Sequence, residues 1–168
     1  NVLSGGNVAP GVSPGVLTTG NLSLASGAHL RLEIGGLTRG AEYDGLDVTG
    51  TVTLAGGLSG SALLGIFGHP NQAAGHIHTG DTFFIILNDD VDPITGTFFE
   101  GANPVANGGT LSISGVPFRI EYDANGDFGT IGNDVALIAL VPEPTGIALL
   151  PAGSAVLLGV RRRARRGA

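Results

Sequence analysis

The chain of 168 residues contains no cysteine, no methionine, no tryptophan and no lysine, and only 13% of its residues are charged. Without cysteine there is no disulfide framework, no zinc–thiolate site and no thiol nucleophile. The chain has eight arginines and 14 acidic residues, so its formal net charge is −6. Phosphate binding requires a basic surface. We therefore expect no nucleic-acid partner.

Glycine is abundant, and this disfavours long helices. The 30 glycines make up about 18% of the chain, against a usual value of about 7%. Leu, Ile, Val and Phe together number 51, about 30% of the residues, which is above the roughly 20% that marks disordered chains. The composition predicts many short strands joined by tight turns around a hydrophobic core.

Hydrophobic periodicity predicts where those strands lie. Apolar and polar residues alternate over 29–34, which is typical of a strand with one buried face. The run 82–87 is continuous, β-branched and aromatic, which predicts a strand buried on both faces. Further strands are predicted at 16–17, 22–24, 46–49, 51–54, 58–67, 95–99, 110–114, 117–122 and 134–140. With no helical pattern in 1–140, we predict an all-β body.

The last 28 residues differ from this body. All 14 acidic residues and only three arginines lie in 1–160, so that part carries a charge of −11. Residues 145–160 are uncharged and mostly apolar, and as a helix they would span roughly 24 Å of the ~30 Å hydrocarbon core. Arginines after an apolar segment stay on the cytoplasmic side of a membrane. The five that follow are Arg161, Arg162, Arg163, Arg165 and Arg166.

A short motif precedes the apolar segment and the arginine cluster, and it consists of Val141, Pro142, Glu143 and Pro144. This order of parts resembles the PEP-CTERM sorting signal. Such signals occur on exported proteins of Gram-negative bacteria that make exopolysaccharide. The resemblance implies that an exosortase-type sorting protease recognises the motif at the inner membrane and removes the tail. It also implies a final place at the cell surface or in the extracellular matrix, with exopolysaccharide as a further partner.

The body has a second resemblance, to autotransporter-associated β-strand repeats. It is carried by short turn-and-strand segments at 9–15, 20–24, 43–50, 80–83 and 132–137. Such regions form right-handed parallel β-helices, and the resemblance implies that residues 1–140 are the last coils of a longer repeat region. The sequence begins without methionine or signal peptide, so we expect a fragment or a trimmed product. A β-sandwich is the alternative fold, because short strands with frequent turns suit it too.

Two polar segments are weak candidates for metal binding. His76 and His78, with His69 nearby, could hold Zn²⁺ or Cu²⁺, but the preferred interpretation is a solvated loop. Asp123, Asn125 and Asp127 match the first half of a calcium loop, yet Asp134 stands where such loops have glutamate. An ordinary turn is therefore preferred, with weak Ca²⁺ binding as the alternative.

No catalytic motif is recognised in the chain. It has no Gly-x-Ser-x-Gly elbow, P-loop or dinucleotide fingerprint. We therefore predict a non-enzymatic, exported structural domain at 1–140 that is followed by a sorting signal at 141–168 and needs no cofactor. The alternatives are a carbohydrate-active enzyme similar to polysaccharide lyases and a calcium-dependent adhesin. Clustered Asp, Arg and Tyr in a cleft would favour the enzyme.

Overall fold

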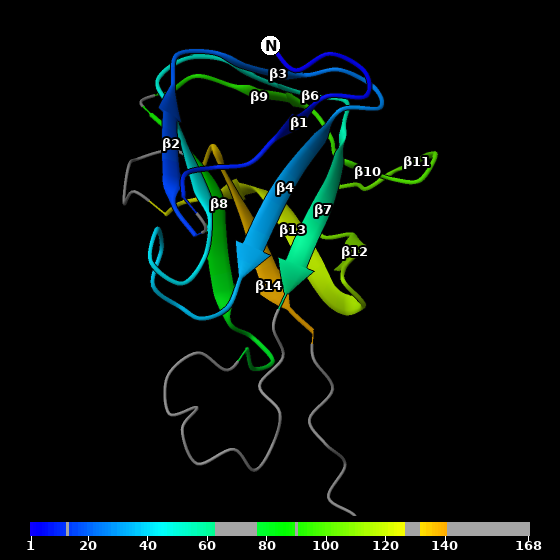
Figure 1. The fold of residues 1–168 in the computed structure, drawn as a ribbon. Coiled ribbons are helices and arrows are strands. Elements are labelled where there is room, and N and C mark those ends of the chain that lie inside the picture. The colour runs from blue at the N-terminus through cyan, green and yellow to red at the C-terminus, as the bar shows by residue number, and fades with distance from the viewer. Residues whose placement is uncertain (13, 63–76, 90, 127–131, 141–168) are drawn as a thin grey trace, which may run out of the picture.

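The computed structural model describes residues 1–12, 14–62, 77–89, 91–126 and 132–140. In these ranges the regular elements are fourteen β-strands and no helix (Figure 1). The prediction of an all-β body is therefore confirmed. The predicted apolar helix at 145–160 lies outside the described residues.

Ten strands form three sets in which neighbours run parallel (Figure 1). The first set is β2 (Val16–Thr19), β5 (Gly45–Val48) and β8 (Thr82–Asn88). The second set is β3 (Leu22–Leu24), β6 (Val52–Leu54) and β9 (Ile94–Gly96). The third set is β1 (Asn7–Val8), β4 (His29–Ile34), β7 (Gly57–Ala62) and β10 (Phe99–Glu100).

The register in these sets places similar residues next to one another. Leu22 pairs with Val52, and Val52 pairs with Ile94, at a spacing of 30 and then 42 residues. Because paired residues of neighbouring strands point to the same face, the sets present apolar rows to the core. Strand β2 is the exception, since its Val16 and Leu17 are exposed. The longer second spacing reflects mainly the segment between β7 and β8, which contains the predicted histidine loop.

The downstream part of the chain pairs antiparallel. Strands β12 (Thr110–Ile113), β13 (Val116–Ala124) and β14 (Asp134–Ala139) extend the first set beyond β8, in the order β12-β13-β14-β8-β5-β2. A short antiparallel pair of β10 and β11 (Asn103–Pro104) ends the third set. Strand β14 thus lies inside its sheet, between β13 and β8.

The core lies between the sets and is built from aliphatic rows and four buried aromatic residues, Tyr43, Phe83, Phe98 and Phe118. Phe83 is fully buried, and its ring lies edge-on to Tyr43 at 5.2 Å and to Phe118 at 6.1 Å between centroids. Complete burial of one large apolar side chain contributes about 1.5–3 kcal/mol. Such edge-to-face pairs add roughly 0.5–1.5 kcal/mol beyond the buried area.

Two strand predictions need correction. The predicted strand at 95–99 is in fact two strands, β9 and β10, because Gly96 adopts a φ of +83° and turns the chain between them. The predicted burial of 82–87 on both faces holds only in part, since Phe84 and Leu87 stay half-exposed. A register shift between β14 and β8 changes the simple alternation there.

Candidate functional site

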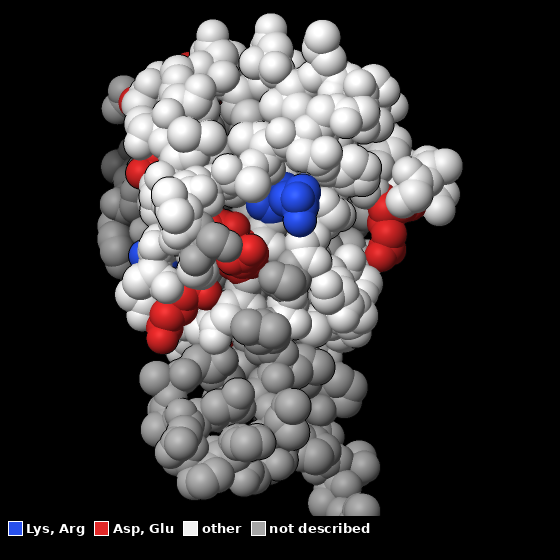
Figure 2. All heavy atoms as spheres, viewed as in Figure 1, with Lys and Arg blue, Asp and Glu red and all other residues white. Residues whose placement is uncertain are grey.

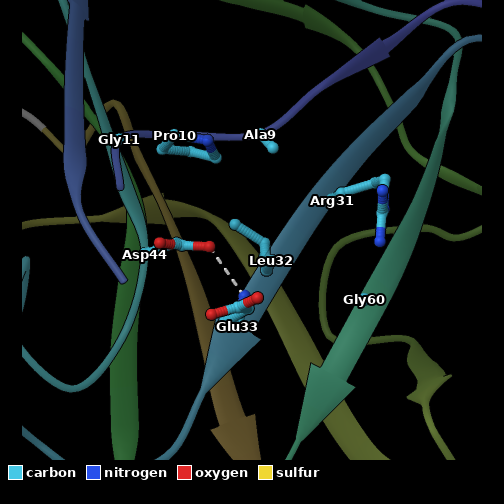
Figure 3. A pocket seen from close by; sticks show the side chains of 8 residues that line it. All are labelled: Ala9, Pro10, Gly11, Arg31, Leu32, Glu33, Asp44 and Gly60. Carbon is cyan, nitrogen blue, oxygen red and sulfur yellow. Dashed lines mark hydrogen bonds between the residues drawn. The ribbon is translucent and has the colours of Figure 1, made fainter. Parts of the chain in front are cut away.

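A charged cavity of about 260 Å³ opens beside the second half of β4 (Figure 3). Its polar lining comes from Arg31, Glu33 and Asp44, and its remaining walls are the 9–11 segment, Leu32 and Gly60. Strand β1 ends at Val8 while β4 continues to Ile34, so this part of β4 lacks a β1 partner. Among the described residues only the short bridge of Ile34 with Tyr43 lies along that edge, and this leaves room for the cavity.

Arg31 and Glu33 lie at alternate positions of β4, so they share its outer face, while Leu32 between them is fully buried. The alternation over 29–34 predicted this arrangement. Figure 2 shows basic atoms gathered at one place over β4, with acidic atoms beside them and a mostly uncharged surface around. The outer face of β4 therefore offers opposite charges at close range.

Asp44 forms the back of the cavity and substitutes for the missing strand. Its carboxylate oxygens accept the backbone N–H of Gly15 at 2.7 Å and that of Glu33 at 2.8 Å. The residue is only 2% exposed. Burial raises the pKa of the Asp44 carboxyl, against the lowering effect of these two hydrogen bonds, and the nearby Glu33 carboxylate raises it further.

The raised pKa gives a pH-dependent prediction. A folded-state pKa above the unfolded value means that protonation of Asp44 favours folding, and that this contribution is lost as pH rises through the folded pKa. We expect the unfolding free energy of wild type minus that of Asp44→Asn to fall as pH rises above about 4. Urea unfolding of both proteins between pH 3.5 and 7 measures it, and a difference that grows with pH would contradict the prediction.

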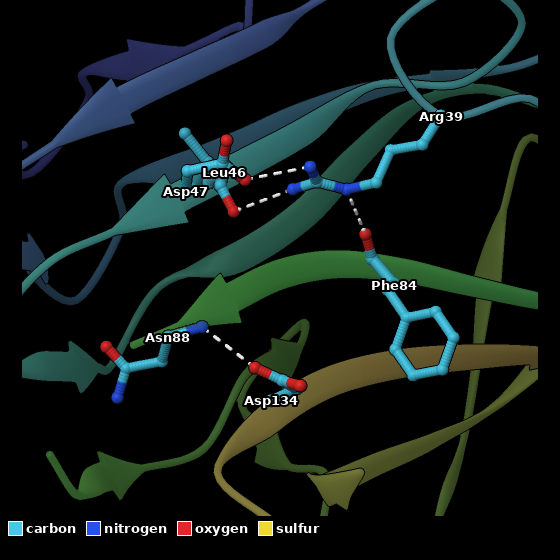
Figure 4. Close-up of polar contacts among 6 residues, drawn as sticks. All are labelled: Arg39, Leu46, Asp47, Phe84, Asn88 and Asp134. Atoms are coloured by element: carbon cyan, nitrogen blue, oxygen red, sulfur yellow. Dashed lines mark hydrogen bonds and ion pairs between the residues drawn. The ribbon is translucent and has the colours of Figure 1, made fainter. Parts of the chain in front are cut away.

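Arg39 bridges two strands of the parallel set (Figure 4). Its Nε donates to the carbonyl of Phe84 on β8 at 3.0 Å, and its Nη2 donates to the carbonyl of Leu46 on β5 at 2.9 Å. Nη1 lies 2.8 Å from the Asp47 carboxylate. A Cβ at Gly45 would meet the guanidinium at 2.5 Å, so a larger residue there would displace the Arg39 side chain from its present place. Arg39 therefore joins β5 and β8 where their ladder begins.

The turn after β13, which begins the candidate calcium segment, lies beside the turn at the end of β8. Asp134, fully buried, accepts the N–H of Asn88 at 2.8 Å and that of Gly126 at 2.6 Å. Figure 4 shows Asp134 facing the backbone of Asn88. Asn133 donates to the carbonyl of Asp89 at 3.3 Å. These bonds tie the turn after β13 to the turn after β8.

The calcium prediction stays untested by this arrangement. Asp123 and Asn125 are both exposed, and Asp127 lies outside the described residues. The side-chain oxygens Oδ1 of Asn88 and Oδ1 of Asp89 are buried without a hydrogen-bond partner. Two oxygens are far fewer than the six to eight that Ca²⁺ takes. Within the described ranges, no group of three or more His, Asp or Glu side chains is placed to hold a metal ion.

Of the other predicted site residues, one is exposed and the rest lie outside the described residues. His78 is exposed. Its backbone N–H donates to Asp81 Oδ2 at 2.6 Å, and this hydrogen bond closes a local turn. His69 and His76 lie outside the described residues, as do the sorting motif 141–144 and the arginines of 161–166. In the part of the chain that the structure describes, no helix is long and apolar enough to cross a membrane.

Sequence reasoning missed Arg39 and Asp44, whose side chains bond to strands and segments far away in the chain. Both lie in the loop between β4 and β5, and their partners are up to 45 residues away in the chain. A lone arginine in a chain with few cations, and an aspartate directly before a strand, were the available signals. Neither specifies its partner.

Comparison with known proteins gives no relative for this chain. A scan against family models, a search of curated proteins and a search of solved structures each found no match.

Proposed function

We propose that this chain is an exported structural protein of a bacterial surface or extracellular matrix, delivered through a C-terminal sorting signal. The observation that carries the proposal is the order of parts after residue 140: the Pro-Glu-Pro motif, an uncharged apolar segment and five arginines. The last strand, β14, ends at Ala139, directly before this sequence. A motif that follows β14 so closely would place the cut directly after the described body, as the proposed sorting requires.

For the body, we propose a right-handed parallel β-solenoid that is capped at its C-terminal end by antiparallel strands. Three parallel sets with matched registers support this fold over a β-sandwich, because sandwiches are built from antiparallel sheets. Each coil would stack its apolar rows on the next, as in other repeat proteins. Such a body is a stiff, acidic spacer or adhesive surface.

In the proposed sorting step, residues 145–160 enter the inner membrane and the arginines remain in the cytoplasm. The motif Pro142-Glu143-Pro144 then lies at the outer interface, where an exosortase-type protease cuts the chain. The proline on each side of Glu143 removes a backbone donor and prevents a helix or strand from continuing through the cleavage region. The folded body is released on the outer side.

Intact mass after export tests the proposal. The chain, preceded by a secretion signal, is produced in a Gram-negative strain that has an exosortase and in the same strain without it. We expect the mass to show loss of the residues beyond the motif in the first strain only. Full-length protein in both strains would overturn the proposed sorting.

Two variants sharpen this test. Glu143→Ala in the motif is expected to abolish processing, and replacement of the five terminal arginines by glutamine is expected to impair retention and processing. Arg119→Gln is the matched control, because this arginine lies in the body on β13 and is partly exposed. If the control alone changed processing, the effect would come from folding rather than from the tail.

A further inference from the structure

On the outer face of the paired strands β4 and β7, large polar side chains of β4 lie beside small residues of β7. His29, Arg31 and Glu33 follow one another on the outer face of β4. The register places His29 opposite Gly57 and Arg31 opposite Ser59 on β7. Since paired residues point to the same face, the small residues of β7 lie lower than the large ones of β4. The imidazole of His29 leans over Gly57, where a Cβ would meet its Nδ1 at 2.9 Å, so the depression is open beside Arg31 and Glu33.

Cavities lie at both ends of this depression. The charged cavity described above, with Arg31 and Glu33 in its lining, is at one end. At the other end a second cavity of about 410 Å³ is lined by Ser26, His29, Phe99 and a run of glycines and alanines. Phe99 pairs with Gly57, so the imidazole of His29 and the ring of Phe99 stand on either side of this glycine. We name the two cavities and the residues between them the β4–β7 groove.

Arg31 is the cation of the groove that has no acidic partner. Of the three arginines in the described ranges, Arg39 pairs with Asp47 at 2.8 Å and Arg119 with Glu121 at 3.0 Å. Arg31 is exposed and makes no ion pair with a described residue. Its five N–H donors are therefore available to a ligand that enters the charged cavity.

The chemistry of the lining selects the ligand. A free anion would be repelled by the carboxylates of Glu33 and Asp44, and a cation would be repelled by Arg31. A pair of neighbouring hydroxyl groups can accept from the guanidinium and donate to a carboxylate at the same time. The rings of Phe99 and His29 in the second cavity provide flat surfaces for C–H groups. Vicinal hydroxyls beside an apolar ring face are the pattern of a sugar.

We propose that the β4–β7 groove binds a neutral saccharide chain, with Arg31 and Glu33 holding one sugar unit and His29 and Phe99 contacting another. The charged cavity is slightly smaller than the roughly 300 Å³ at which drug-sized pockets begin, which suits a single sugar ring. The inference concerns binding alone and involves no bond cleavage. It does not depend on the sorting signal, since all its residues belong to the body.

The test uses the 168-residue chain and two soluble probes, neutral cellobiose and anionic digalacturonate. Saturation-transfer NMR and titration calorimetry are expected to show binding of cellobiose that is tighter than that of digalacturonate. Arg31→Ala is expected to weaken cellobiose binding roughly tenfold or more, because charge-assisted hydrogen bonds are lost. Phe99→Ala is expected to weaken it to a smaller extent.

Arg119→Ala is the matched control, since it removes an arginine from a different sheet and is expected to leave binding unchanged. Circular dichroism verifies that each variant keeps the wild-type fold. The proposal is overturned if wild type gives no saturation transfer with cellobiose, if only digalacturonate binds, or if Arg31→Ala binds cellobiose as wild type does. A failure of exosortase processing would leave these results unaffected, so the two proposals are tested separately.

Discussion

Gly60→Ala is expected to lower the free energy of unfolding by roughly 3–5 kcal/mol, although it adds only one methyl group. Gly60 has a φ of +134°, a conformation that costs an L-residue about 1–3 kcal/mol. A Cβ at this position would also overlap the carbonyl oxygen of Leu32, its partner on β4. Backbone atoms of a paired ladder cannot move aside independently, so overpacking adds about 1–3 kcal/mol.

Gly80→Ala is the control for this experiment. Gly80 also has a positive φ, +92°, but a Cβ there would have no atom within 4 Å. Its substitution therefore isolates the conformational cost from the collision, and we expect about 1–2 kcal/mol. Urea unfolding monitored by circular dichroism measures both variants. Equal losses would show that the β4–β7 ladder adapts to the methyl group.

Arg39→Ala is expected to cost about 2–4 kcal/mol, because three interactions are lost at once. The carbonyls of Phe84 and Leu46 lose their donors in a partly buried place, at about 1–3 kcal/mol for each buried group left without a partner. The ion pair with Asp47 adds little, since that carboxylate is 39% exposed and screened by solvent. Hydrogen exchange is expected to become faster in β5 and in the first half of β8.

Two variants test whether the geometry of the guanidinium matters. Arg39→Lys keeps the charge but loses the planar fork that reaches both carbonyls, so we expect most of the loss to remain. Arg119→Ala removes a partly exposed arginine from the pair with Glu121 and is expected to change stability by less than about 0.5–1 kcal/mol. If Arg39→Lys were as stable as wild type, charge rather than strand bridging would explain the role of Arg39.

The sequence predicted the strands well where one face is buried and the other is exposed to solvent. Alternation located β3 and β4 with the correct bounds, and it placed Arg31 and Glu33 on one face. It could not show that β9 and β10 are separate, because the turn depends on the positive φ of Gly96 rather than on hydrophobic pattern. The local hydrophobic pattern indicates which residues are buried. Turns of the backbone are indicated only by glycine, and glycine also occurs where the chain does not turn.

The candidate site was predicted less completely than the strands. The outer row of β4 follows from period two, but the cavity beside it arises because β1 is shorter than β4. Asp44 reaches Gly15 across 29 residues, and Arg39 reaches Phe84 across 45. Such contacts depend on how the sets of strands stack, which a single sequence does not specify.

The position of β14 inside its sheet determines how the molecule responds to a pull on its tail. The chain leaves β14 at Ala139, and β13 and β8 both pair antiparallel with it, so its hydrogen bonds lie across the strand direction. Tension applied through residue 140 along this axis loads the bonds on both sides together, in shear, rather than breaking them one after another from an end. A body anchored by its last strand in this way resists mechanical extraction better than one anchored by an edge strand.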